Sequence, residues 1–269
     1  MAGSSARLAL VTGASAGIGE AFARAYAAKG FDLALVARRA ERLQALADEL
    51  KERHGVQVLV IPADLAVWEA HVPVLEALAK AGRHVDVLVN NAGFGVPQSF
   101  TGAPWERQRD FLMTLVVSAC GLAYGVIPGM TERGWGRIVN VASLAAFAPG
   151  ASGYTLYPAA KSFAVKFSQA LDAELRDKGI MVTAVCPGFT KTEFAAASGA
   201  QHLMDQAPRR FWQSSEQVAQ AAIAANEAGR VLVVPGWHNK LAAGLMQLLP
   251  DSLLSALIRR GAAKYRLKD

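Results

Sequence analysis

The chain has 269 residues, with 28 lysines and arginines against 22 acidic residues and a formal net charge of +6. Its 52% apolar and 19% charged residues exclude a disordered chain and leave room for one large α/β domain or two small ones. The cations are dispersed, and no basic stripe carries interleaved aromatic residues. We therefore expect no nucleic-acid binding, and a site for a phosphate-rich small molecule explains part of the positive excess.

The cysteines and histidines give no sign of a disulfide framework or a metal site. Cys120 and Cys186 lie inside apolar segments, which is typical of reduced thiols in a cytoplasmic protein. The five histidines show no metal-ligand spacing. The N-terminal segment "MAGSSARLALVTG" reads neither as a signal peptide nor as a membrane span.

Apolar, β-branched segments alternate with helical patterns along the chain. Continuous apolar strands of this kind are typical of a parallel sheet covered on both faces. We predict one doubly wound, Rossmann-type α/β domain with a seven-stranded parallel sheet over 1–236, followed by a helical extension at 237–269. The expected strands are 7–12, 32–37, 56–61, 85–90, 136–142, 180–186 and 231–235, and the expected helices are 17–29, 39–53, 68–81, 105–133, 156–178 and 215–228.

A glycine-rich turn, "TGASAGIG", directly follows the first strand and opens the first helix. A dinucleotide pyrophosphate needs a tight turn without Cβ atoms, and a helix N-terminus whose free N–H groups face the negative charge. Such a turn can also be only a tight connection, but its position between strand and helix favours the cofactor site. The candidate residues are Gly13, Ser15, Gly17, Ile18 and Gly19.

The end of the second strand reads "LVARRAERL", with Arg38 and Arg39 where NAD sites usually carry an acid. Paired guanidinium groups suit a ribose 2′-phosphate. The alternative is that the arginines only begin a solvated helix, yet cations at a helix N-terminus oppose its dipole and so favour a bound anion. We therefore expect NADP (NADPH), with NAD the less favoured cofactor.

Two further strand ends carry polar candidates. Asp64, in "IPADL", either caps the following helix or accepts from the adenine amino group, with the Leu65 backbone beside it. "NNAG" at 90–93 is either a turn or part of the ligand crevice along the carboxyl ends of the strands. Because all these loops fall on one sheet edge, we expect Asn91, Ala92 and Gly93 at the cofactor.

The stretch "SGYTLYPAAKS" contains Tyr157 and Lys161 at i and i+4, on one face of a helix. A neighbouring ammonium stabilises a phenolate and lowers the tyrosine pKa toward the range useful for proton transfer. Ser143 ends the fifth strand and could orient a carbonyl oxygen. Because Pro158 suits a first helical turn, the helix should begin near 156–157, and Tyr154 then lines the substrate pocket or packs nearby.

The ordered motifs TGASAGIG, ARR, Asp64, NNAG, NVAS, YPAAK and PGFTKT, from Arg7 to Pro235, resemble the classical short-chain dehydrogenase/reductase family. Within it, the chain looks most like a poorly characterised bacterial branch. The resemblance implies Ser143 as the holder of the substrate oxygen, Tyr157 as general acid/base, and Lys161 as a ribose ligand that lowers the tyrosine pKa. It also implies a homodimer or homotetramer through the helices at 105–133 and 156–178. Further implied cofactor contacts are Pro187, Gly188, Thr190 and Thr192.

One position departs from the family pattern. An asparagine usually stands fifteen residues before the methionine of a "P-x-M" helix end, and here that position is Leu115. Leucine cannot hold a water in the proton relay from Lys161. Our hypothesis is that Ser118 or Thr114 keeps the water; the alternative is that Leu115 simply fills the core and turnover is reduced or lost.

The sequence thus predicts an NADPH-dependent carbonyl reductase, with a cofactor-binding or sensor protein of little or no turnover as the alternative. The flap at 191–212 and the stretch 94–100 are apolar and favour a lipophilic substrate, although Arg209 and Arg210 suit an acidic group. Residues 237–269 should form helices packed on the body or on a neighbouring subunit. A lid, or peripheral contact with anionic lipid through the cations Arg259, Arg260, Lys264, Arg266 and Lys268, is the alternative.

Overall fold

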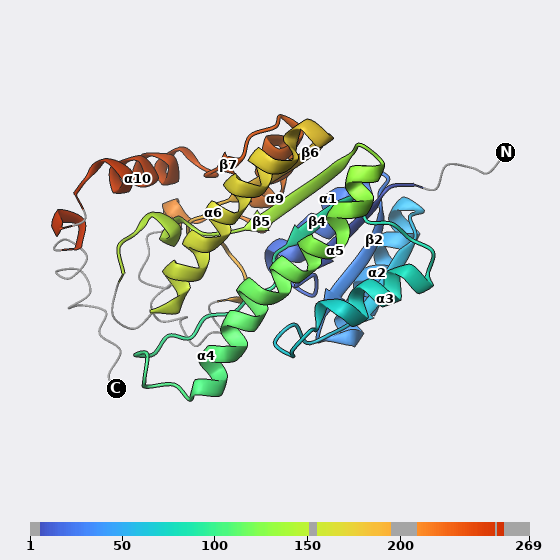
Figure 1. The fold of residues 1–269 in the computed structure, drawn as a ribbon, viewed down its shortest axis with the longest axis horizontal. Coiled ribbons are helices and arrows are strands. Elements are labelled where there is room, and N and C mark those ends of the chain that lie inside the picture. Colours follow the sequence, from blue (N-terminus) through green and yellow to red (C-terminus); the bar gives the residue numbers. More distant parts are fainter. Residues whose placement is uncertain (1–5, 151–154, 195–208, 251, 256–269) are drawn as a thin grey trace.

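The computed structural model describes residues 6–150, 155–194, 209–250 and 252–255. All seven predicted strands are present and form one parallel sheet in the order β3-β2-β1-β4-β5-β6-β7 (Figure 1). The predicted doubly wound Rossmann-type fold is therefore confirmed. The strands are β1 Leu8–Thr12, β2 Asp32–Ala37, β3 Val58–Pro62, β4 Val87–Asn90, β5 Gly136–Val141, β6 Ile180–Val185 and β7 Leu232–Val233.

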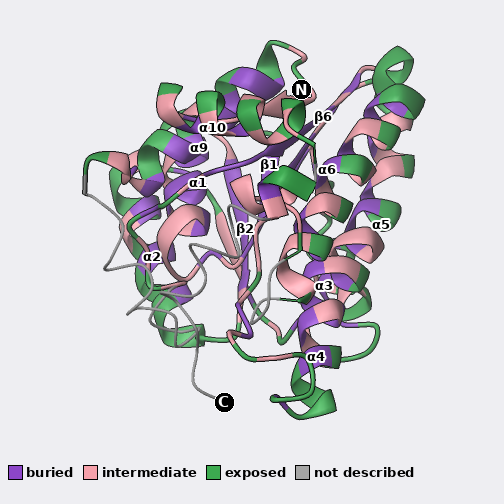
Figure 2. Cartoon of the chain, turned by 90° about the vertical axis from the view of Figure 1, so that its left-hand side faces the viewer, coloured by how far each residue is buried: buried purple, intermediate pink, exposed green. Residues whose placement is uncertain are grey.

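Helices cover both faces of the sheet, because the strands are apolar on both sides. In β1, Ala9 and Val11 pack into the core beneath α1, α2 and α9, whereas Leu8 and Leu10 pack beneath α3, α5 and α6. Figure 2 shows these buried strands between the two helical layers. The helices are α1 Gly17–Ala28, α2 Ala40–His54, α3 His71–Lys80, α4 Trp105–Leu112, α5 Ser118–Glu132, α6 Leu156–Leu175, α9 Ser215–Glu227 and α10 Trp237–Leu248, with short helical turns η2 Leu144–Phe147, η3 Arg176–Lys178 and η4 Arg209–Phe211.

The strand order reverses between β1 and β4, which pair in parallel although β2 and β3 intervene in sequence. At such a switch point the loops after the two strands diverge to opposite faces and open a crevice at the carboxyl ends. The glycine turn after β1 and the NNAG turn after β4 lie on either side of it. The fold therefore places the predicted site residues at one edge.

The predicted helix 105–133 is not uniform. A π-helical segment, η1 Met113–Val117, separates α4 from α5 and contains Leu115. The whole helix Trp105–Glu132 is long and apolar enough to cross a membrane by length and composition alone. An 18-residue window of it has a mean hydropathy of 1.9, and 39% of that window is buried inside the protein. Its inward side chains, Leu122 and Met130 among them, belong to the core between sheet and helix.

The C-terminal extension begins with α10, which packs on the body through Asn239 and Ala243, both buried. Asn239 donates to the Gln213 side chain and to the Pro235 carbonyl, both at 2.9 Å. Its solvent side carries Trp237, Leu241, Leu245 and Leu248, all exposed. Tyr154, the flap residues 195–208 and the basic tail 256–269 lie outside the described residues, so their predicted roles stay predictions.

Candidate active site

The fold brings Ser143, Tyr157 and Lys161 together at the carboxyl edge of the sheet. Ser143 follows β5 as the N-cap of η2, and its hydroxyl accepts from the Ala145 N–H at 3.1 Å. The helix α6 begins one residue before Tyr157, as predicted, so the tyrosine lies in its first turn and Lys161 one turn later. The Tyr157 hydroxyl is hydrogen-bonded with Ser143, and Lys161 Nζ lies 5.6 Å from the centre of the Tyr157 ring.

The electrostatics of this group differ from the expectation that Lys161 lowers the tyrosine pKa. Burial raises the pKa of Tyr157 above its usual value, and the hydrogen bond with Ser143 only partly offsets it. Burial also lowers the pKa of Lys161 to about 8, while its Nζ donates to the Val141 carbonyl at 2.8 Å. In the protein without ligands, the removal of Tyr157 from water therefore raises its pKa more than the nearby Lys161 ammonium lowers it.

The glycine turn and NNAG are joined directly across the switch point. The Asn91 side-chain amide donates to the Thr12 carbonyl at 2.9 Å, and the Thr12 hydroxyl accepts from the Asn91 and Ala92 N–H groups. A Cβ on Gly13 would lie 2.7 Å from Asn91 Nδ2, and one on Gly19 would lie 2.3 Å from the Gly13 carbonyl oxygen. Both glycines are needed for this close approach, and Thr12 is a site residue that the sequence analysis did not single out.

The first turn of α1 fits an anionic group. Its N-cap, Ala16, makes no side-chain cap hydrogen bond, so it leaves the leading N–H groups of the helix open to a ligand. A Cβ on Gly17 would lie 3.0 Å from the Thr192 side chain, which places Thr192 directly over this turn. Helix N-termini of this kind bind phosphate groups, and the arrangement therefore fits the pyrophosphate of a dinucleotide. Ser15 and Ile18 belong to the same turn.

The two arginines after β2 have different surroundings. Arg39 contacts the Ser15 hydroxyl through Nη2 at 3.1 Å and the Glu193 carboxylate through Nη1 at 2.9 Å. Arg38 is two-thirds exposed, and its Nη1 lies 4.0 Å from Asp64. The Arg38 side chain is 67% exposed and that of Arg39 45% exposed, so an incoming ligand can reach both. Glu193 is a partner that the sequence analysis missed.

Asp64 and Leu65 are held by local hydrogen bonds. The Asp64 carboxylate accepts from the Ala66 N–H at 3.1 Å within the turn that follows β3. It does not cap the next helix, because α3 begins at His71 with Ala70 as its N-cap, so the capping alternative is wrong. The Leu65 carbonyl accepts from the Ser118 hydroxyl at 2.8 Å. The predicted contacts of Asp64 and Leu65 with the adenine stay predictions.

The loop after β6 forms the third wall of the site. The Pro187 carbonyl accepts from the N–H of Leu144, the residue after Ser143, at 2.9 Å. Gly188 has no room for a side chain, because a Cβ would lie 2.4 Å from Asn239 Oδ1. The Thr190 hydroxyl donates to the Gly188 carbonyl at 3.1 Å. The extension α10 thus supports the loop that the family resemblance assigns to the nicotinamide.

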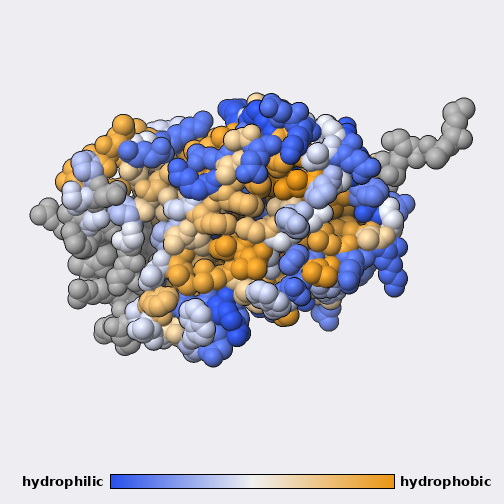
Figure 3. Space-filling view, in the orientation of Figure 1, coloured by the Kyte–Doolittle hydropathy of each residue, from blue (hydrophilic) through white to orange (hydrophobic). Residues whose placement is uncertain are grey.

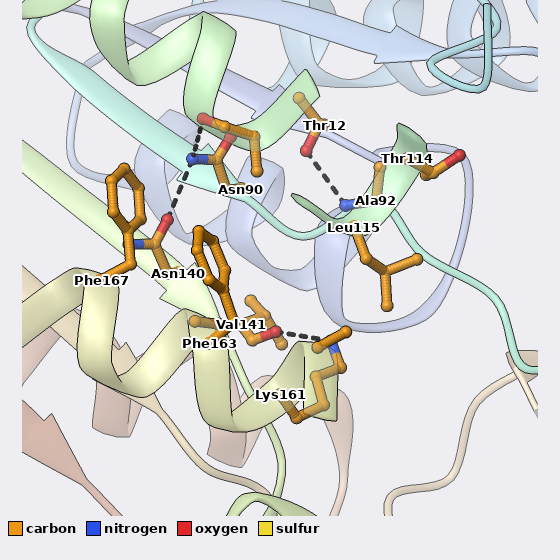
Figure 4. Close-up of a pocket in the computed structure, with 13 residues that line it drawn as sticks. Thr12, Asn90, Ala92, Thr114, Leu115, Asn140, Val141, Lys161, Phe163 and Phe167 are labelled. Carbon is orange, nitrogen blue, oxygen red and sulfur yellow. Dashed lines mark hydrogen bonds between the residues drawn. The ribbon is translucent and has the colours of Figure 1, made fainter. Parts of the chain in front are cut away.

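Leu115 is 8% exposed and packs among apolar side chains beside α6, the helix that carries Tyr157 and Lys161. A Cβ on Gly93 would lie 3.3 Å from the Leu115 side chain, so the leucine covers NNAG. Behind it is a cavity of about 20 Å³ between η1, α6 and the ends of β4 and β5 (Figure 4). A cavity of this size holds about one water molecule.

The lining of the cavity distinguishes between Thr114 and Ser118, the two candidates to replace the missing asparagine. Thr114 lines it together with Lys161 (Figure 4). The hydroxyl of Thr114 donates to the Asp110 carbonyl at 2.8 Å and keeps its acceptor capacity. Ser118 is directed elsewhere, since its hydroxyl donates to the Leu65 carbonyl. Ser118 does not line the cavity, so the geometry favours Thr114, and the hypothesis that one of the two hydroxyls holds a water stays a prediction.

A buried amide pair, missed from the sequence, forms the floor of the cavity. Asn90 and Asn140 are opposite each other in the β4–β5 register, and Asn90 Nδ2 donates to Asn140 Oδ1 at 2.9 Å. Asn140 Nδ2 donates to the Ser168 hydroxyl at 2.8 Å, which ties the sheet to α6. Asn90 Oδ1 is buried without a partner among the described residues. The signal was one asparagine near the end of each of two adjacent apolar strands.

The comparisons with known proteins agree with this geometry. The family model for the short chain dehydrogenase matches residues 7–203. An uncharacterized oxidoreductase of Myxococcus xanthus is 34% identical over 260 residues, covering 97% of this chain and 99% of that protein. The very-long-chain 3-oxoacyl-CoA reductase of Anas platyrhynchos is 37% identical over 71% of this chain but only 62% of its own length.

Among solved structures, a short-chain dehydrogenase from Sphingobium yanoikuyae in complex with NADPH superposes with a TM-score of 0.79. It is 32% identical in sequence, and the match covers 91% of this chain and 96% of that chain. Family model, relatives and solved structure all point to one family, and the solved structure shares the fold. The chain therefore belongs to the classical short-chain dehydrogenase/reductase family and is an NAD(P)-dependent oxidoreductase of carbonyl and alcohol groups.

Proposed function

We propose that the protein is an NADPH-dependent reductase of a lipophilic carbonyl compound, with Tyr157 as general acid/base. The observation that carries this proposal is the group formed by the partly buried Ser143 and Tyr157 and the buried Lys161, beside a glycine turn that fits a pyrophosphate. Bound NADPH would supply the hydride. Ser143 then orients the substrate oxygen, Tyr157 delivers its hydroxyl proton to that oxygen, and Lys161 stabilises the resulting phenolate.

The raised tyrosine pKa suits the reductive direction. A phenol with a pKa above its usual value is fully protonated at neutral pH, so it carries the proton that a nascent alkoxide needs. Lys161, with a pKa near 8, is still mostly an ammonium at that pH. The two groups are therefore in the protonation states that reduction requires before a substrate arrives.

Apolar side chains around the tyrosine support a lipophilic substrate. The Tyr157 ring lies between Phe111, at 6.5 Å, and Phe194, at 5.9 Å, measured between ring centres. Phe189 stacks on Trp212 beside the predicted nicotinamide loop and is 42% exposed. A compound with a large hydrocarbon part gains most from a pocket with this lining.

The preference for NADPH is supported by the arginines and by the absence of an acid at the end of β2. Arg38 and Arg39 present guanidinium groups at this edge, and Ser15 adds a hydroxyl. A 2′-phosphate accepts from these donors directly, whereas a free 2′-hydroxyl leaves Arg39 with Glu193 and Arg38 near Asp64.

The proposal is tested by NADPH oxidation over a panel of ketones and aldehydes, including aromatic, steroid and acyl-thioester carbonyls. We expect turnover with bulky apolar carbonyls and a loss of at least about a hundredfold in Tyr157→Phe. NADPH binding, followed by the quenching or transfer of its fluorescence, should survive that substitution. If neither protein oxidises NADPH although both bind it, the catalytic proposal fails and the cofactor proposal stands.

A second function is favoured by one observation. Leu115 fills the position of the family's relay asparagine with a well-packed apolar side chain. This supports an NADP-binding or sensor protein that turns over slowly or not at all. The panel above separates the two functions, and Thr114→Val tests whether the neighbouring hydroxyl replaces the asparagine.

We also propose that the protein acts in the cytoplasm as a homo-oligomer. Both described cysteines are free thiols, and Figure 3 shows apolar residues gathered over α5 and α6 on one face. The exposed residues there include Val117, Phe163 and Tyr124, the last 84% exposed. Apolar patches on a helix pair favour burial against a second copy. Sedimentation of the protein, and of Tyr124→Glu, tests this proposal.

A further inference from the structure

An ion-pair cluster links the predicted 2′-phosphate site to Glu193, in the segment that follows β6. The Glu193 carboxylate accepts from Arg39 Nη1 at 2.9 Å and from Arg42 Nη1 at 2.8 Å. Arg39 also contacts the Ser15 hydroxyl in the glycine turn. Glu193 is more than 150 residues away from both arginines in sequence, so only the tertiary fold brings this acid to them.

The position of the carboxylate is where a cofactor anion would be bound. Arg39 is the N-cap of α2 and Arg42 lies in its first turn, and no side chain caps this helix. Cations at a helix N-terminus are opposed by the dipole, and a nearby anion offsets that repulsion. Glu41 lies in the first turn, and Glu193 is the anion that accepts hydrogen bonds from both arginines when only the protein is present.

A carboxylate and a phosphate monoester compete for the same guanidinium donors. Both accept paired N–H groups in fork geometry, and the phosphate carries more charge, about −1.5 to −2 at pH 7. Arginine stays charged throughout, so the donors are always available to one anion or the other. All three side chains are about half exposed, which lets an incoming phosphate reach them without unpacking the core.

The neighbours of Glu193 connect this exchange to the rest of the site. Thr192 lies over Gly17 at the pyrophosphate turn, and Phe194 packs on the Tyr157 ring at 5.9 Å. The Phe194 N–H donates to the Thr192 hydroxyl at 3.3 Å. A single short strap, 192–194, therefore joins the phosphate site, the arginine pair and the catalytic tyrosine.

We propose that Glu193 is an internal competitor for the cofactor 2′-phosphate: it occupies Arg39 and Arg42 in the free protein and is displaced when a 2′-phosphorylated nucleotide binds. Its displacement releases the strap 192–194 from α2. Glu193 is thus a specificity-determining residue that weakens binding of every 2′-phosphorylated ligand and leaves ligands without that phosphate unaffected. This inference rests on the proposed preference for NADP.

The test compares two ligands that differ only by the 2′-phosphate: adenosine 2′,5′-bisphosphate and adenosine 5′-monophosphate. Their dissociation constants are measured by calorimetry at one fixed ionic strength, because exposed ion pairs are screened by salt. In Glu193→Gln we expect the bisphosphate to bind roughly two- to tenfold more tightly, from the usual range for two exposed ion pairs. The monophosphate should change by less than about twofold.

A matched control is available at the far end of α1. Glu227 pairs with Lys29, and the two side chains are 52% and 45% exposed, the same as Glu193 and Arg39. Glu227→Gln removes one surface charge of the same kind away from the cofactor edge. It should leave both dissociation constants unchanged, so any general charge effect on nucleotide binding is measured separately.

The release of the strap has its own readout. Amide hydrogen exchange of a peptide covering 189–194 should be faster with the bisphosphate bound than with the monophosphate. In Glu193→Gln the exchange should already be fast without ligand.

The outcomes are distinguishable. If the unmodified protein does not prefer the bisphosphate, the NADP preference fails. If it does prefer the bisphosphate but Glu193→Gln binds both ligands as before, or tightens both equally, the competitor role of Glu193 is overturned.

Discussion

Replacing Gly13 and Gly55 with alanine separates the cost of backbone conformation from the cost of a close approach. Both residues have a left-handed conformation, with φ of +65° at Gly13 and +67° at Gly55. A Cβ on Gly55 meets nothing within 4 Å, whereas one on Gly13 lies 2.7 Å from Asn91 Nδ2 and 3.0 Å from the Ala92 backbone. The two substitutions thus share one energetic penalty and differ in the other.

For Gly55→Ala we expect a loss of about 1–2 kcal/mol in the free energy of unfolding, the usual penalty of a left-handed non-glycine residue. Gly13→Ala adds about 1–3 kcal/mol, because the new Cβ clashes with the Asn91 side-chain amide, which its hydrogen bond to the Thr12 carbonyl holds in place, and presses on the Ala92 backbone. Urea denaturation measures both changes. NADPH affinity, followed by fluorescence, should fall at least about tenfold in Gly13→Ala only, because the pyrophosphate turn itself is displaced. Equal losses of stability and affinity in the two variants would refute the close-approach argument.

Three further predictions follow from the site. The reduction rate should be constant below pH 8 and fall as the pH rises through the Lys161 pKa of about 8. Below that pKa Lys161 is an ammonium, which stabilises the Tyr157 phenolate. A rate that stays constant up to pH 10 contradicts this prediction. Asn140→Ala should cost about 2–5 kcal/mol of unfolding free energy, since it removes two buried hydrogen bonds, and Ser168→Ala, which removes one of them, should cost less. Thr114→Val should slow turnover roughly tenfold if its hydroxyl holds the relay water, with KM and the melting temperature little changed; an unaffected rate excludes Thr114 from the relay.

The local sequence predicted most of the fold, for a physical reason. Strands buried on both faces must be apolar throughout, so β1, β4 and β5 are visible as continuous apolar segments. Helix signals are equally local, and the start of α6 beside Pro158 was predicted to the residue. The motif residues Ser143, Tyr157 and Lys161 could be placed together because parallel strands all end at one edge.

What the sequence by itself determined is therefore the sheet, the glycine turn and the choice of candidate catalytic side chains, because each depends on short-range pattern and spacing. Only the tertiary structure decided the direction of the tyrosine pKa, since that depends on how completely the ring is removed from water. It also decided that the Ser118 hydroxyl donates to the Leu65 carbonyl, whereas Thr114 lines the cavity. The pairing of Glu193 with the arginines of α2 could not be predicted, because long-range ion pairs between exposed residues leave no periodic signal in the chain.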